Sequence, residues 1–192
     1  MRTQEIELFC ITELDEEAKT KAVEYLRDSD YYGADTGEIE GPVKDKLREY
    51  GLPTETIEWS LGHSQGDGVA FYGDIDVQKL LMNIGEWSKY SWLVYDYELS
   101  ATSTRNSLGN HYSHFNTMDV YMQRERDYRT EQARMLGKEL WELIKLRVQS
   151  VSKELEKLGY EIIEASREKE YIIECAEANE MEFREDGRLW HG

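Results

Sequence analysis

The stretch that organises this chain is IEWSLGHSQGDGVAFYG, residues 57–73. Apolar and polar residues alternate over 57–61 and again over 69–71, as they do in strands with one buried face. The centre, residues 62–68, holds three glycines, and an Asp-Gly pair favours a tight reversal of the chain. The stretch therefore predicts a β-hairpin with a polar corner. The side chains that we expect at this corner are those of Ser64, Gln65 and Asp67.

The remaining sequence predicts an α+β fold in a single domain, residues 1–192, with a mainly antiparallel sheet of about four strands covered by helices. Composition and the absence of any linker-like segment favour one domain at this length. In chain order we expect a strand over 5–11, helices over 16–28, 43–50 and 76–87, strands over 92–104 and 112–122, a long helix over 128–158, a helix capped by Ser166, and a short strand over 181–183.

The long helix in the C-terminal half is predicted from apolar residues that recur at spacings of three and four, such as Leu140, Ile144, Val151 and Leu155. The apolar stripe is narrow enough to resemble a coiled-coil seam. Because the chain also supplies a sheet that needs covering, we expect this stripe to pack on the sheet.

The chain is strongly acidic, with 23 basic and 40 acidic residues and a formal net charge of -17. The excess is -7 over residues 1–50, -6 over 51–122 and -4 over 123–192, so it is not a detachable acidic tail. Such a surface repels phosphate backbones and attracts basic surfaces, including the nucleic-acid grooves of other proteins. Acidity for solubility alone is the simpler alternative. Direct nucleic-acid binding is not expected.

The absence of a recognisable targeting signal favours the cytoplasm. The first residues lack the apolar core of a signal peptide, and no apolar run approaches the length of a membrane span. Two cysteines, Cys10 and Cys175, are far apart in sequence and do not suggest a disulfide framework. We therefore expect a reduced cytoplasmic protein that does not contact a membrane.

Residues 62–66, GHSQG, match the G-x-S-x-G pattern of the serine nucleophile in α/β-hydrolases. That chemistry needs the serine on a sharp turn from a strand into a helix. Here the following residues, 67–73, have the pattern of a strand. The sequence therefore argues against a serine hydrolase.

The histidines do not form an evident metal site. His111 and His114 are three apart, and on the predicted strand such positions point to opposite faces. No cysteine pair has metal-ligand spacing. We predict no metal and no cofactor. An enzymatic alternative remains, in which Gln65, Asp67 and His114 meet at a concave pocket, with Asp67 or His114 as general base.

Four segments resemble a family of small proteins encoded by phages and prophages, often labelled "antitoxin of toxin–antitoxin stability system". SQGDGVAFYG at 64–73 is similar to the family's S-Q-G-D-G-A-S-F-x-G, and Tyr112-Ser113-His114 with Met118 resembles its Y-x-H segment. ANEMEFREDGR at 178–188 is similar to the family's A-N-E-x-E-F-x-E-D-G-R ending, and residues 14–22 resemble its opening. Val69, Ala70 and His63 depart from the family pattern. The resemblance implies a phage origin and the cytoplasm of an infected bacterium.

These observations favour a phage accessory protein that binds and inhibits a host defence protein, such as a CRISPR nuclease, by occupying its surface or mimicking nucleic acid. The alternatives are an enzyme with its site at the hairpin corner and His114, and an antitoxin that neutralises a cognate toxin. A homodimer is left open by the sequence. The candidate binding residues are Ser64, Gln65, Asp67, Tyr112 and His114.

Overall fold

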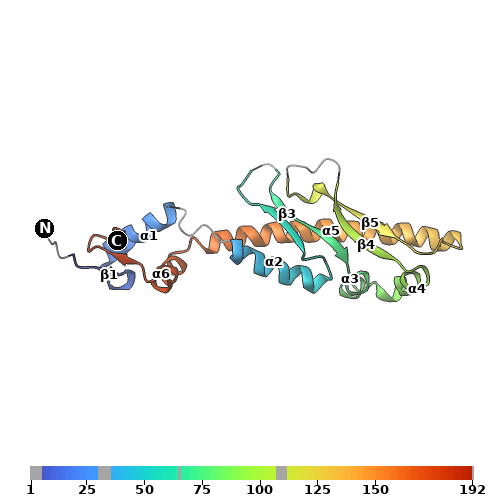
Figure 1. Cartoon of the computed structure of the whole chain (residues 1–192), viewed down its shortest axis with the longest axis horizontal. Coiled ribbons are helices and arrows are strands. Elements are labelled where there is room, and N and C mark those ends of the chain that lie inside the picture. The colour runs from blue at the N-terminus through green and yellow to red at the C-terminus, as the bar shows by residue number, and fades with distance from the viewer. Residues whose placement is uncertain (1–5, 30–35, 65, 107–111, 192) are drawn as a thin grey trace. The chain divides into compact units, whose positions relative to one another are not determined.

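The computed structural model describes residues 6–29, 36–64, 66–106 and 112–191, without the side chains of residues 36 and 37. The chain forms two compact units (Figure 1). Unit 1 comprises residues 1–39 and 161–192, and unit 2 comprises residues 40–160. The predicted α+β class is confirmed: helices accompany a four-stranded antiparallel sheet and a two-stranded sheet. That the whole chain behaves as one domain stays a prediction.

Unit 2 contains the four-stranded sheet, with the strand order β2-β3-β4-β5. The hairpin predicted from residues 57–73 is confirmed, because β2 pairs with β3 so that Ile57 lies opposite Phe71 and Trp59 opposite Val69. Each further neighbour in the sheet is antiparallel as well. The strands are β2 (Thr56–Ser60), β3 (Gly68–Ile75), β4 (Ser100–Arg105) and β5 (Met118–Gln123).

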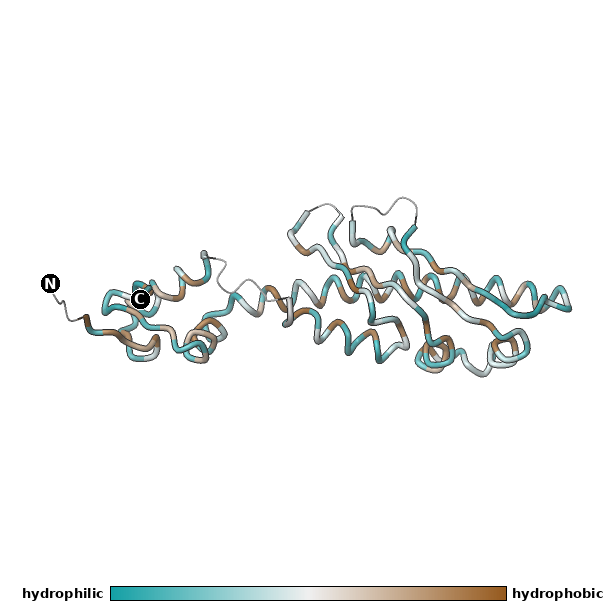
Figure 2. Tube along the Cα trace, in the orientation of Figure 1, coloured by the Kyte–Doolittle hydropathy of each residue, from teal (hydrophilic) through white to brown (hydrophobic). Residues whose placement is uncertain are grey.

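The long helix α5 (Glu131–Ala165) packs on this sheet, as predicted. Its Trp141 side chain donates a hydrogen bond from Nε1 to the Val120 carbonyl of β5 at 2.8 Å, and its Ser152 hydroxyl donates to the Val69 carbonyl of β3. Hydrophobic bands recur along the helix in Figure 2, with the spacing that gave the prediction. The buried residues include Ala133, Leu140, Ile144, Val148, Val151 and Leu155.

Three shorter helices complete unit 2: α2 (Thr36–Tyr50), which begins in unit 1, α3 (Val77–Asn83) and α4 (Trp87–Tyr97). Helix α3 begins after Asp76, whose carboxylate accepts a hydrogen bond from the Lys79 backbone N–H at 2.9 Å. Helix α2 ends before Gly51, whose positive φ of 71° is typical of the residue after a helix.

The predicted strand over 92–104 is wrong in its first half, which belongs to α4. Tryptophan, valine and tyrosine made residues 92–97 look like a strand. The buried residues Tyr90, Leu93 and Tyr97 instead follow helical spacing, and the strand begins only at Ser100. The strand predicted over 112–122 is similarly shorter, because β5 begins at Met118 after a 3₁₀ turn, η2 (Phe115–Thr117).

Unit 1 is a small α+β unit built from both ends of the described chain. Asp15 caps α1 (Glu16–Asp28) as predicted, accepting a hydrogen bond from the Ala18 N–H at 2.8 Å. Ser166 does not cap α6 (Lys169–Ala178), because its hydroxyl donates back to the Ile163 carbonyl at the end of α5. The elements are β1 (Phe9–Cys10), η1 (Ile11–Glu13), α1 (Glu16–Asp28), α6 (Lys169–Ala178) and β6 (Glu182–Phe183).

The core of unit 1 joins the two helices to the two-stranded sheet. The side chains that fill it are Ile11, Leu14, Ala18, Ala22, Val23, Leu26, Ile172, Ala176 and Phe183. Strand β1 pairs antiparallel with β6, so the first described strand meets the last. No helix in the described ranges is long and apolar enough to cross a membrane.

Candidate functional site

The hairpin corner is organised by the carboxylate of Asp67, whose side chain is buried. Its Oδ1 accepts hydrogen bonds from the hydroxyls of Ser60 at 2.9 Å and Ser64 at 2.7 Å. Its Oδ2 accepts from the backbone N–H groups of Gly62 at 2.7 Å and Ser64 at 2.8 Å. The phenol of Tyr160 also donates to Oδ2, at 2.7 Å. Five donors therefore converge on one carboxylate.

Burial by itself would raise the pKa of Asp67, but the hydrogen bonds from Ser64, Tyr160 and Ser60 outweigh it and hold the pKa well below its usual range. A carboxylate in this state is ionised at neutral pH and a weak proton acceptor. Its lone pairs are directed at donors of the protein itself. We therefore assign Asp67 to the architecture of the corner, and not to proton transfer.

Helix α5 holds the corner in place through Tyr160. The Tyr160 ring stacks on the ring of His63, with centroids 4.6 Å apart and planes 23° from parallel. The Tyr160 hydroxyl also accepts a hydrogen bond from the His63 N–H at 3.3 Å. Directly before Tyr160 in the chain, Gly159 leaves room for the Leu61 side chain, with which a Cβ at this position would overlap. The corner is thus fixed to a helix that lies far from it in sequence.

The structure brings the 112–114 segment against the same corner. The Tyr112 ring lies over Gly66, and a Cβ on Gly68 would come within 2.7 Å of the Ser113 carbonyl oxygen. Both glycines have positive φ, 102° at Gly66 and 155° at Gly68. They therefore serve two purposes: they turn the chain, and they admit a neighbouring backbone.

Four of the five candidate binding residues, Ser64, Asp67, Tyr112 and His114, accordingly lie in one neighbourhood. Gln65 lies outside the described residues. Ser64 and Tyr112 are exposed, whereas Asp67 is buried. Whether these residues bind a ligand stays a prediction. Sequence reasoning missed Tyr160, since nothing local signals a partner 93 positions away.

His114 also has a local structural role. Its Nδ1 accepts a hydrogen bond from the Asn116 N–H at 3.2 Å, which caps the η2 turn. Its carbonyl accepts from the N–H and hydroxyl of Thr117 at 2.8 and 2.7 Å. The ring leans on Phe115, over which the Lys153 ammonium of α5 lies at 4.0 Å from the centroid. These contacts fix the strand start that follows.

The serine of the G-x-S-x-G match does not sit in a nucleophile elbow. Ser64 donates its hydroxyl to Asp67, and the chain continues into β3 instead of a helix. Among the described residues no three histidine, cysteine or acidic side chains gather as a metal site.

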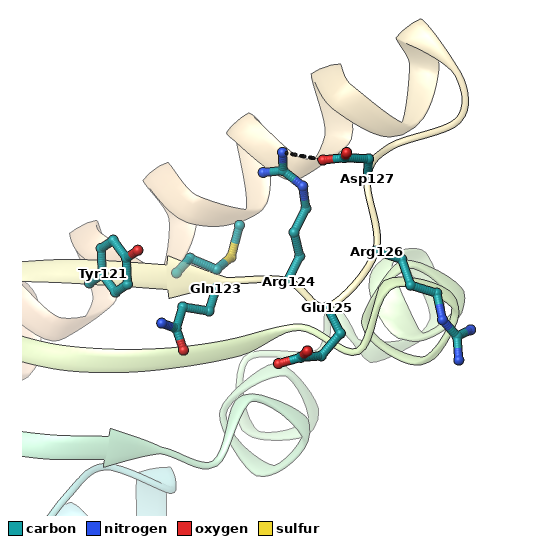
Figure 3. Close-up of a pocket in the computed structure, with 7 residues that line it drawn as sticks. Tyr121, Gln123, Arg124, Glu125, Arg126 and Asp127 are labelled. Carbon is teal, nitrogen blue, oxygen red and sulfur yellow. Dashed lines mark hydrogen bonds and ion pairs between the residues drawn. The ribbon is translucent and has the colours of Figure 1, made fainter.

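A second region of interest lies where β5 runs into the loop before α5 (Figure 3). Residues 121–127 line an open pocket of ≈ 380 Å³ there. Arg124 forms an ion pair with Asp127 at 3.0 Å, whereas Arg126 points away from this pair and pairs with Glu98. Because each of these arginines already has an acidic neighbour, the pocket does not present a concentrated positive charge.

The two units differ sharply in charge. Unit 1 holds 8 basic and 21 acidic residues over 71 positions, a formal net charge of -13. Unit 2 holds 15 basic and 19 acidic residues over 121 positions, a net charge of -4. The acidity that looks even along the sequence is therefore concentrated in one unit, because that unit is assembled from two distant segments.

The exposed acids of unit 1 follow its elements. On α6, Glu170, Glu174 and Glu177 are exposed and recur at spacings of four and three, on the side away from the buried Ile172 and Ala176. Helix α1 and the turn after β6 add further exposed carboxylates, among them Glu17, Glu24, Asp28, Glu185 and Asp186.

No protein-family model, curated protein or solved structure matches this chain.

Proposed function

We propose that the protein binds and inhibits a host protein by covering a basic surface on it, of the kind that normally holds nucleic acid. The observation that carries the proposal is the charge of -13 on the 71 residues of unit 1. A dense anionic surface speeds association with a basic groove and selects it over neutral surfaces. The resemblance to phage-encoded proteins makes a bacterial defence protein in the cytoplasm the natural target.

An enzyme at the hairpin corner is the second candidate, favoured by the contact between the corner and the segment that carries His114. The saturated carboxylate of Asp67 weighs against it, because a general base needs a lone pair free for the substrate proton. A protein that acts by binding needs no such group, so we place surface occupation first. An antitoxin that covers a cognate toxin would use the same kind of surface.

The proposal predicts that partner binding depends on salt and on unit 1. Tagged protein captures its partner from bacterial lysate, and the purified pair is then titrated. Raising the salt from about 50 mM to about 300 mM is expected to weaken binding at least about tenfold, because exposed charges are screened over a shorter distance. Nucleic acid bound by the partner should compete for the same surface.

A matched pair of variants locates the effect. The triple variant Glu170→Gln, Glu174→Gln, Glu177→Gln removes three exposed charges from unit 1, and Asp96→Asn, Glu125→Gln, Glu142→Gln removes three from unit 2. The first variant is expected to weaken binding about tenfold, because exposed charges at an interface contribute a few tenths to about 1 kcal/mol each. The second is expected to weaken binding less than about twofold, because its charges belong to unit 2 and lie outside the proposed binding surface. Equal effects, or a complex indifferent to salt, would contradict the proposal.

A further inference from the structure

Unit 1 has a pocket beside the turn that follows α6. The pocket has a volume of ≈ 420 Å³ and lies between the end of α6 and the segment after β6. It combines apolar side chains with carboxylates, and among the described residues that line it there is no lysine or arginine. The lining residues are Asn179, Glu180, Met181, Glu182, Leu189, Trp190 and His191.

The apolar part of the pocket is anchored in the core of unit 1. Met181 and Leu189 are half-buried and pack against the core cluster. Trp190 is half-buried and is held to β6 by its backbone N–H, which donates to the Glu182 carbonyl at 2.8 Å. These contacts give the pocket a fixed apolar wall, against which the aliphatic stem of a long side chain can lie.

The Trp190 ring already accommodates a cation of the protein itself. The guanidinium of Arg184 lies over this ring, 5.1 Å from its centroid. A guanidinium gains from such a position because the face of an indole carries negative potential. The contact shows that this ring binds a guanidinium, and a partner arginine that used the same face would take the place of Arg184 there.

The turn after α6 places the carboxylates. The Met181 N–H donates to the Ala176 carbonyl and the Glu180 N–H to the Glu177 carbonyl, each at 2.9 Å. This pair of bonds is the Schellman pattern, with Glu180 in the left-handed position (φ 50°) that glycine usually takes. Glu180 and Glu182 are both exposed, so their charges flank the pocket.

We propose that this pocket receives an arginine side chain of the partner protein. The inference rests on the proposed function and names the chemistry of one contact within it. Met181 and Leu189 meet the methylene stem, Trp190 the planar face of the guanidinium, and Glu180 and Glu182 its N–H donors. A planar fork of donors suits carboxylates and an aromatic face better than the compact ammonium of lysine does.

The test uses three short peptides as probes: one containing two arginines, one with citrulline in their place, and one with lysine. Citrulline keeps the shape of arginine and removes its charge. Binding to the full-length protein is followed by calorimetry and by the NMR signal of the Trp190 indole N–H, assigned with Trp190→Phe. We expect the arginine peptide to bind and shift this signal, the lysine peptide to bind several-fold more weakly, and the citrulline peptide not to bind.

Two variants with the same net charge separate the pocket from the general acidity of unit 1. Glu180→Gln with Glu182→Gln alters the pocket, and Glu24→Gln with Glu164→Gln removes two exposed charges of unit 1 outside it. The first pair is expected to lower the affinity for the arginine peptide at least fivefold, and the second pair less than twofold. Equal weakening, or binding without movement of the Trp190 signal, would overturn the pocket and leave surface occupation standing. Failure of every basic peptide to bind at low salt would count against both.

Discussion

Replacing Asp67 with alanine is expected to lower the free energy of unfolding of unit 2 by about 3–5 kcal/mol. The substitution leaves five donors around a site that is 5% exposed, and water replaces the lost carboxylate poorly there. It also releases the corner from Tyr160. Chemical denaturation followed by far-UV circular dichroism measures the change. Asp74→Ala is the matched control, because Asp74 is exposed and accepts a single side-chain bond from Thr102 at 3.0 Å.

The same carboxylate gives the unfolding free energy a defined pH dependence. The pKa of Asp67 is lower in the folded chain than in the unfolded chain, so its contribution is present above the ordinary carboxyl pKa of about 3.9 and is lost as the pH falls. Asp67→Asn does not titrate. The stability difference between the wild-type protein and this variant is therefore expected to be constant from about pH 7 to about pH 5 and to shrink below about pH 4. A difference that grew on acidification would contradict this assignment.

Replacing Gly187 with alanine is expected to cost unit 1 about 2–5 kcal/mol, from two separate sources. Its φ of 83° disfavours any residue with a Cβ, at about 1–2 kcal/mol. The added Cβ would also overlap the Ala18 carbonyl oxygen of α1, and because that oxygen belongs to a helix backbone it has little freedom to move. Hydrogen exchange measures the loss: the backbone amides of Val23 and Leu26, in the core of unit 1, are expected to exchange faster in the variant.

Gly85→Ala separates the two sources. Gly85 has a similar φ of 77°, but a Cβ there would have no neighbour within 4 Å. This control is expected to cost about 1–2 kcal/mol in unit 2, from backbone strain alone. If both variants lost the same amount, the close approach of Gly187 to α1 would have no energetic weight.

The parts of the fold that sequence predicted best are those with local signals. The hairpin at 57–73 carries its alternation and glycines in one window, and Asp15 stands directly before the helix it caps. Helix α4 was missed because its aromatic and β-branched residues imitate a strand, although Tyr90, Leu93 and Tyr97 already had helical spacing. For residues 92–97 the spacing of the buried residues is a better guide to secondary structure than the strand-like composition.

The candidate site could be predicted only in part, because its contacts are made across long stretches of chain. The polar corner could be recognised from Ser64 and Asp67, but not the phenol of Tyr160 that closes it. Charge was misleading for a related reason. Counting along the sequence averages over unit 1 and unit 2, whereas the fold collects the two ends of the described chain into one strongly acidic body.

That assembly from two distant segments has a consequence for the order of events on the ribosome. Helix α1 is synthesised before most of unit 2, but the side chains that cover it, such as Ile172 and Phe183, are synthesised only after unit 2. Unit 2 leaves the exit tunnel before these residues do and can therefore fold first. Folding of unit 2 also draws the two segments together, which lowers the entropic cost of joining them. A nascent chain therefore lacks the finished anionic body until the second segment of unit 1 has emerged.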